Sequence, residues 1–164
     1  MYGPDHVVKI SSLSSFLGKK LHAKLVRDHA ICKKYFTDFV VETVDVTPVS
    51  GVPHTEIQPY IQGEMLRREH LRNPTIRAQF DKVVGAMMQM KEDGCPQIDL
   101  IGNGGVFKQR LSNIIIDTNN ALHIIDTTLY EAKSVGPFGR VLEILIPLAT
   151  MRQKYLLWKF SKQN

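Results

Sequence analysis

The sequence contains few of the residues that cross-link a chain or anchor it in a membrane. Its two cysteines, Cys32 and Cys95, fit neither a zinc spacing nor a disulfide framework, so we expect a reducing, cytoplasmic setting. The first residues lack the basic region and apolar stretch of a signal peptide. The most apolar segment, Val141 to Ala149, contains Glu143 and Pro147 and is too short to span a bilayer. No membrane partner is therefore expected.

The composition is that of an ordinary globular domain with a small basic excess. The hydrophobic share of 43% and the charged share of 23% among 164 residues are typical of one soluble domain and exclude a disordered or fibrous protein. The net charge of +5 favours an anionic ligand, a nucleic acid or an acidic surface, but only weakly. A solvated basic surface is the more ordinary explanation of this excess.

The first third of the chain has the pattern of a small β-rich unit with one helix. Residues 7–10 are short and β-branched, which predicts a strand. Apolar residues recur at helical spacing over 16–36, and the opposite side of that helix is basic. Residues 39–46 and 55–61 are expected to form two strands, joined by turn residues at 47–53.

The remainder is expected to be more helical and to carry one hairpin. Asn73 and Pro74 are typical of a helix start, and the apolar spacing continues to about Lys91. Two apolar runs around a polar turn predict a β-hairpin from Ile114 to Ile125. A last helix is expected from about Gly139 to Phe160. Together these elements predict an α+β fold.

The hairpin carries the most informative polar residues. Asn113 directly precedes its first strand, and Asp126 ends its second strand. Because a hairpin brings its two ends together, an amide oxygen and a carboxylate are expected in one place. Mg²⁺ prefers such hard oxygen ligands and commonly takes one or two of them from protein. The alternative is an ordinary hairpin with polar ends.

Several segments resemble protein kinases and their small-molecule relatives. The segments Leu111 to Asp117 and Leu122 to Thr127 are similar to the kinase hairpin that begins with a metal-binding Asn and ends with a metal-binding Asp. Val7 to Ile10 resembles the strand whose Lys contacts the α- and β-phosphates. Asp28 lies near the place of the Glu that pairs with that Lys, and Glu56 to Leu66 resembles the hinge between the kinase lobes.

The resemblance spans Val7 to Thr127 and implies one kinase-like domain over residues 1–164. It implies a truncated β-rich lobe at 1–61 and a short helical lobe with a catalytic hairpin at 62–164. It also implies ATP and Mg²⁺ as cofactors, with a protein or a small molecule as acceptor. The implied roles are phosphate binding by Lys9, orientation of Lys9 by Asp28, adenine binding at Tyr60 and Ile61, Mg²⁺ binding by Asn113 and Asp126, and positioning or deprotonation of the acceptor by Asp99.

The sequence also departs from the kinase pattern. The Gly-rich phosphate loop is missing, and Thr127 and Thr128 replace the Phe and Gly that usually follow the metal-binding Asp. Fourteen positions separate Asp99 from the hairpin Asn, where kinases have five. The inserted segment offers cations that could steady the γ-phosphate, and glycines whose backbone could contact phosphate: Lys108, Arg110, Gly102, Gly104 and Gly105.

Three functions remain open on these grounds. The first is an ATP- and Mg²⁺-dependent phosphotransferase. The second is a pseudokinase, a nucleotide-binding interaction module without turnover, which the missing loop and the insertion favour. The third is a nucleic-acid-binding domain that uses the basic helix at residues 19–34, although that helix lacks interleaved aromatic residues.

Overall fold

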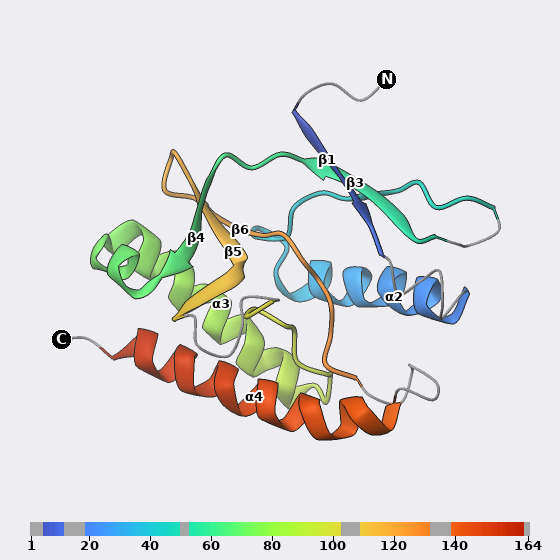
Figure 1. Cartoon of the computed structure of the whole chain (residues 1–164). Coiled ribbons are helices and arrows are strands. Elements are labelled where there is room, and N and C mark those ends of the chain that lie inside the picture. Colours follow the sequence, from blue (N-terminus) through green and yellow to red (C-terminus); the bar gives the residue numbers. More distant parts are fainter. Residues whose placement is uncertain (1–4, 12–18, 50–52, 103–108, 132–138, 163–164) are drawn as a thin grey trace.

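The computed structural model describes residues 5–11, 19–49, 53–102, 109–131 and 139–162. Over these residues the chain forms an α+β fold with two three-stranded antiparallel sheets and three α-helices (Figure 1). The sheets, named A and B here, follow one another along the chain and meet at residues 60–62. The α+β expectation is confirmed at this level.

Sheet A contains β1 (His6–Ile10), β2 (Val44–Asp45) and β3 (Thr55–Pro59) in the order β1-β3-β2. Its register places Lys9 opposite Glu56, and Glu56 opposite Asp45. These three side chains therefore form a row on one face, since directly opposed residues share a face of a sheet. Figure 1 shows α2 (Lys19–Tyr35) running beneath this sheet.

Sheet B contains β4 (Gly63–Arg67), β5 (Arg110–Asp117) and β6 (Leu122–Ile124) in the order β4-β5-β6. The β5–β6 pair confirms the predicted hairpin. Its turn is fixed by Asp117, whose Oδ1 accepts hydrogen bonds from two backbone amides of the turn at 2.8 Å each. Strand β4 was not predicted, because its partner β5 lies more than forty residues further along the chain.

Two helical elements, η1 (Arg68–Arg72) and α3 (Pro74–Glu92), lie between β4 and β5, and α4 (Gly139–Ser161) follows β6. The Asn73 side chain accepts a hydrogen bond from the Thr75 amide and caps α3, as the sequence predicts. The predicted helices at 73–91 and 139–160 are confirmed, and the earlier one is confirmed over α2, with 16–18 outside the described residues. In the described part of the chain, every helix is too short or too polar to cross a membrane.

The hydrophobic core joins sheet B to the helices. Phe80 of α3 lies against Phe160 of α4, with ring centroids 6.1 Å apart. Ile57, the buried aliphatic side chain of sheet A, is not part of this core cluster. Sheet A is therefore attached to the rest of the molecule through contacts in which polar groups have a large share.

The strand predicted at 39–46 is wrong in extent. Only Val44 and Asp45 form a regular strand. Phe39, Val40 and Val41 are buried in the core region beside β6, where the Phe39 carbonyl accepts from the Ile124 amide at 2.7 Å. Their β-branched and aromatic pattern thus reflects burial against sheet B, to which Val40 is joined by an isolated bridge with Ile124.

Candidate functional site

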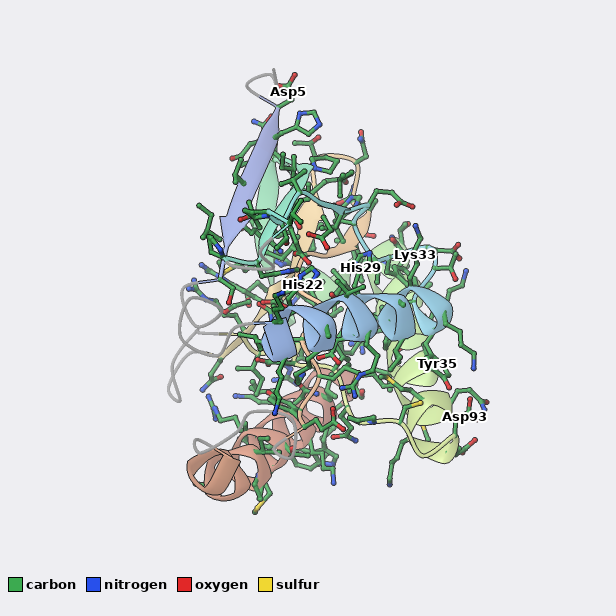
Figure 2. All side chains as sticks on the ribbon, turned by 90° about the vertical axis from the view of Figure 1, so that its right-hand side faces the viewer. Asp5, His22, His29, Lys33, Tyr35 and Asp93 are labelled. Carbon is green, nitrogen blue, oxygen red and sulfur yellow. The ribbon has the colours of Figure 1, made fainter. Side chains whose placement is uncertain are left out.

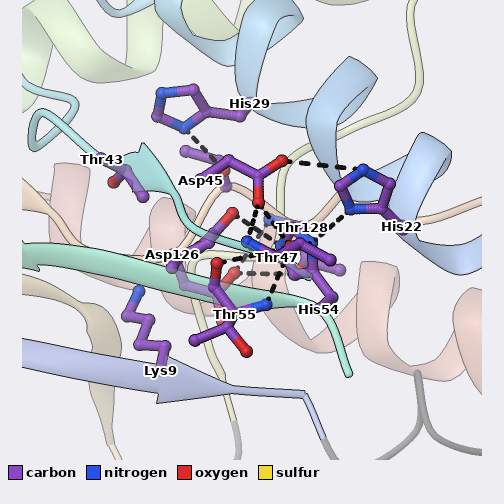
Figure 3. A network of polar contacts seen from close by, with 12 residues as sticks. Lys9, His22, His29, Thr43, Asp45, Thr47, His54, Thr55, Asp126 and Thr128 are labelled. Atoms are coloured by element: carbon purple, nitrogen blue, oxygen red, sulfur yellow. Dashed lines mark hydrogen bonds and ion pairs between the residues drawn. The ribbon is translucent and has the colours of Figure 1, made fainter. Parts of the chain in front are cut away.

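A cavity of about 650 Å³ lies between the two sheets and gathers most of the predicted site residues. Lys9, Asp99, Asn113 and Asp126 all line it, although they come from four separate segments of the chain. The expectation that Lys9 and Asp126 face a common cleft is thus met by the geometry. Figure 3 shows Lys9 extending from β1 toward the side on which Asp126 lies.

Lys9 lies between two carboxylates and is the cation at the β1 side of the cavity. Its Nζ donates to the Ile125 carbonyl. Burial lowers the pKa of the ammonium below its ordinary value of 10.5, and Asp126 and Glu56 partly offset this. Alternation along β1 explains the placement: Val8 and Ile10 point to solvent, so Lys9 points inward.

Asn113 is held in one orientation by its neighbours. Its Nδ2 donates to the Asp99 carbonyl oxygen at 2.7 Å, which leaves Oδ1 as the acceptor atom of the amide. Gly102 packs against that oxygen with a φ of +61°, and a Cβ added there would lie 2.3 Å from Oδ1. Glycine is required at this position both for the backbone angle and for the space beside Asn113.

Asp99 lies in a turn that several groups hold in place. Its Oδ1 accepts from the amides of Ile101 and Gly102 at 2.9 Å each, and from the Tyr130 hydroxyl at 2.7 Å. Burial raises the pKa of Tyr130 well above its ordinary value, and Asp99 raises it further, so the hydroxyl keeps the proton that it donates. The Asp99 carboxylate is thereby fixed at the edge of the cavity.

Gln153 of α4 supports the same turn from behind. Its side chain is almost completely buried, donates to the Ile98 carbonyl and accepts from the Leu100 amide, both at 2.8 Å. These bonds pair the backbone on both sides of Asp99. Sequence reasoning missed Gln153 because nothing in its local pattern distinguishes it from a surface glutamine on a helix.

Asp126 closes the hairpin end of the cavity. Its Oδ1 accepts from the Thr128 amide at 3.0 Å and from the Thr128 hydroxyl at 2.7 Å. Thr128 therefore orients the carboxylate by a local hydrogen-bonded turn.

Two buried polar atoms on β5 have no hydrogen-bond partner in the part of the chain that the structure describes. Ser112 Oγ and Arg110 Nε are buried and have no hydrogen-bond partner among the described residues, and both residues line the cavity. Buried polar atoms are normally paired, so these two atoms are exceptions within the described part of the chain. Arg110 thus lies where the sequence predicted a cation, whereas Lys108, Gly104 and Gly105 fall outside the described residues.

The predicted pairing of Asp28 with Lys9 is wrong. The Asp28 carboxylate is fully buried and binds Lys24, Arg27 and the Leu129 amide. Asp28 points from α2 toward the segment after β6, while Lys9 lies across the cavity on sheet A. The carboxylate beside Lys9 is Glu56, its partner across the strands.

The predicted adenine contacts at Tyr60 and Ile61 are not supported by the geometry. Neither residue lines the cavity. The Tyr60 amide donates to the Asp5 carbonyl at 2.7 Å, so the N–H assigned to adenine already has a partner. These residues instead connect β3 with β4, and so join the two sheets.

The comparisons with known proteins give no family for the chain: no family model matches the sequence, and a search of curated proteins finds no match.

Proposed function

We propose that the protein is an ATP- and Mg²⁺-dependent phosphotransferase whose acceptor is a protein or a small molecule. The observation that carries this proposal is the convergence of Lys9, Asp99, Asn113 and Asp126 on one cavity. The cavity volume of about 650 Å³ falls within the range of ordinary small-molecule sites.

The donor set fits a magnesium ion. Asn113 lies inside β5, not before it as the sequence predicted, and Asp126 follows β6 by two residues. Asn113 Oδ1 and the Asp126 carboxylate are hard oxygen donors on one hairpin, and Mg²⁺ commonly takes two such ligands beside phosphate oxygens and water. When bound, the ion would neutralise negative charge on the β- and γ-phosphates. The Asp99 carbonyl and Gly102 keep the Asn113 oxygen in its orientation.

The cations of the site would bind the phosphates. Lys9 offers an ammonium group at the opposite wall, and phosphate oxygens would replace or share its contact with the Ile125 carbonyl. Arg110 and Ser112 of β5 also line the cavity, and Arg110 adds a second positive charge there. Asp99 would hold the acceptor hydroxyl by a hydrogen bond or take up its proton, in the role that kinases give to their catalytic-loop Asp.

A nucleotide-binding module without turnover is the second candidate, and one observation favours it. Three donors converge on Oδ1 of Asp99, so this carboxylate is tied into its own turn. A general base must reach the acceptor hydroxyl, and such a fixed carboxylate has little freedom to do so. Binding of ATP would persist in this case, while transfer would not occur.

The basic helix offers less support for nucleic-acid binding. Lys24 of α2 is buried in its ion pair with Asp28, and Lys33 binds Glu42. Figure 2 shows Lys33 near one end of α2 and His22 near the other. Because part of the positive charge is used inside the protein, α2 presents less of it to a phosphate backbone than its sequence indicates.

Turnover measurements separate the first two candidates. We expect ATP hydrolysis or autophosphorylation by the wild type, and a loss of several orders of magnitude in Asp126→Asn, because charge stabilisation is usually the largest catalytic contribution. Asp117→Asn is the matched control, since Asp117 lies on the same hairpin but does not line the cavity. Equal activity in wild type and Asp126→Asn would rule out this site.

A further inference from the structure

Three potential metal ligands converge where α2 meets sheet A. His22 of α2, Asp45 of β2 and His54, which precedes β3, each offer one ligand atom, and these atoms all lie within 4.8 Å of one another. Figure 3 shows the His22 ring facing Asp45 on one side and His54 on the other. Within the described part of the chain, one group of three potential metal ligands has its ligand atoms this close together, and it is this one.

The hydrogen bonds of His54 define which of its nitrogens faces the cluster. Its Nε2 lies 2.9 Å from Oε1 of Glu56, a carboxylate that can only accept when ionised, so Nε2 carries the hydrogen. The other nitrogen, Nδ1, faces Nδ1 of His22 at 2.9 Å. His54 is buried, with 3% of the residue's surface exposed. Two imidazole nitrogens this close need either a proton or a metal cation between them.

Glu56 acts on His54 as the outer partner of a metal-binding histidine does. Histidine ligands usually donate their second ring N–H to a carboxylate, which fixes the tautomer and the direction of the ring. Asp45 is held in a similar way, because its Oδ1 accepts from the Thr47 amide at 2.9 Å. Its Oδ2 lies 3.7 Å from Nε2 of His22. His22 thus presents Nδ1 to His54 and Nε2 to Asp45, and a shared ion would bind only one of these two nitrogens, so binding requires a shift of Asp45 or of the His22 ring.

We propose that His22, His54 and Asp45 form a binding site for a divalent transition metal of the zinc class, with Glu56 as the residue that orients His54. Two imidazoles and one carboxylate suit Zn²⁺ and leave a fourth tetrahedral position for water. Ligand atoms around Zn²⁺ lie about 3.3 Å apart for bonds of about 2.0–2.1 Å, so atoms that lie within 4.8 Å of one another need to close by about 1.5 Å at most. Asp45, with 39% of its side chain exposed, can make that movement.

A metal at this position would fasten sheet A to α2. The ligands come from both elements, and the buried aliphatic side chain of sheet A, Ile57, stays outside the main core. Metal binding to a preformed site adds directly to the free energy of folding. The site would also hold Glu56, and through it the strand pair that carries Lys9. Its ligands differ from the proposed Mg²⁺ ligands on the β5–β6 hairpin, although His54 and Glu56 line the same cavity.

Direct metal binding tests the proposal. The full chain is treated with a chelator, desalted and titrated with ZnCl₂ by calorimetry, without nucleotide, and CoCl₂ is used to record the visible spectrum. We expect one Zn²⁺ per chain, a Co²⁺ spectrum typical of tetrahedral coordination, and an increase in thermal stability with zinc. His22→Gln and Asp45→Asn should weaken zinc binding at least tenfold, and Glu56→Gln by about 10- to 100-fold.

Two controls make the result decisive. His70→Gln removes a histidine from η1 outside the cluster, and Asp126→Asn alters the proposed Mg²⁺ site, so both should bind zinc as the wild type does. His22 and Asp45 are partly exposed, and their variants are expected to fold, which circular dichroism verifies. No zinc binding by the wild type at micromolar metal, or equal binding by His22→Gln and His70→Gln, overturns the proposal. Because zinc binding is measured without nucleotide, either result leaves the proposed nucleotide binding to be tested by its own titration.

Discussion

Asp28 is the residue for which the structure changes the sequence-based role most, and its replacement gives a sharp prediction. The carboxylate is completely buried and contacts the Lys24 ammonium, while the Leu129 amide donates to it at 3.1 Å. Lys24 is itself 6% exposed and also donates to the Leu129 carbonyl at 3.1 Å. Asp28 and Lys24 thus join α2 to the segment that follows β6.

Asp28→Asn keeps the shape of the side chain and removes its charge, which leaves the Lys24 ammonium buried without a counter-ion. Breaking a buried ion pair on one side typically costs about 3–5 kcal/mol. Asparagine still accepts from the Leu129 amide, so we expect a loss near the lower value, about 3 kcal/mol. Small domains have about 5–15 kcal/mol of unfolding free energy in total, so the loss is readily measured.

Urea unfolding followed by circular dichroism provides the assay, with the free energy of unfolding extrapolated to zero denaturant. Asp81→Asn is the matched control, because Asp81 is an exposed aspartate of α3 and should change stability by less than about 0.5 kcal/mol. At urea concentrations below the unfolding transition, the folded Asp28→Asn variant should bind nucleotide as the wild type does. A loss under about 1 kcal/mol, or a specific loss of nucleotide binding, would refute the structural role of Asp28.

Three further predictions concern other positions. Gly102→Ala should displace the Asn113 amide and weaken Mg²⁺-dependent nucleotide binding at least tenfold. Gly85→Ala, with open space around it in α3, should instead raise the unfolding free energy by about 0.5–1 kcal/mol. Equal nucleotide binding by the two variants would contradict the role of Gly102. Burial raises the pKa of the Cys32 thiol to about 12, so at pH 8 mass spectrometry should find alkylation at the half-buried Cys95 first, and prior labelling of Cys32 would contradict the structure. Burial alone would raise the pKa of Asp117, but the turn amides and a neighbouring histidine hold the pKa below its ordinary value of 3.8. The contribution of Asp117 to stability is therefore complete above pH 3.8 and is lost as pH falls through the lowered pKa. The difference in unfolding free energy between wild type and Asp117→Asn should shrink in acid, and a difference that grows there would refute the assignment.

Local patterns predicted the elements that are stabilised locally. The β5–β6 hairpin has two apolar runs around a turn that Asp117 fixes by its own hydrogen bonds, so a short window of sequence contains its cause. The α3 helix likewise begins with its own Asn73 cap. The placement of Lys9 on the inner face followed from the resemblance, and the alternation along β1 agrees with it.

Contacts between distant segments could not be predicted in the same way. Asp28 was assigned to Lys9 from its place in the kinase resemblance. The fold instead surrounds it with Lys24 and the Leu129 amide, which come from its own helix and from a segment about a hundred residues later. Gln153 binds the backbone beside Asp99 only because α4 packs there. Side-chain pairs of this kind depend on tertiary packing, for which a single sequence gives no periodic signal.

Calorimetric titration of the protein with ATP, in the presence of Mg²⁺ and in the presence of a chelator, tests the central claim most directly. The account predicts binding of ATP that Mg²⁺ strengthens. It predicts that Lys9→Met weakens ATP binding under both conditions, and that Asp126→Asn abolishes the difference made by Mg²⁺. Absence of binding at millimolar ATP in the folded wild type, or unchanged Mg²⁺-dependent binding in both variants, would contradict it.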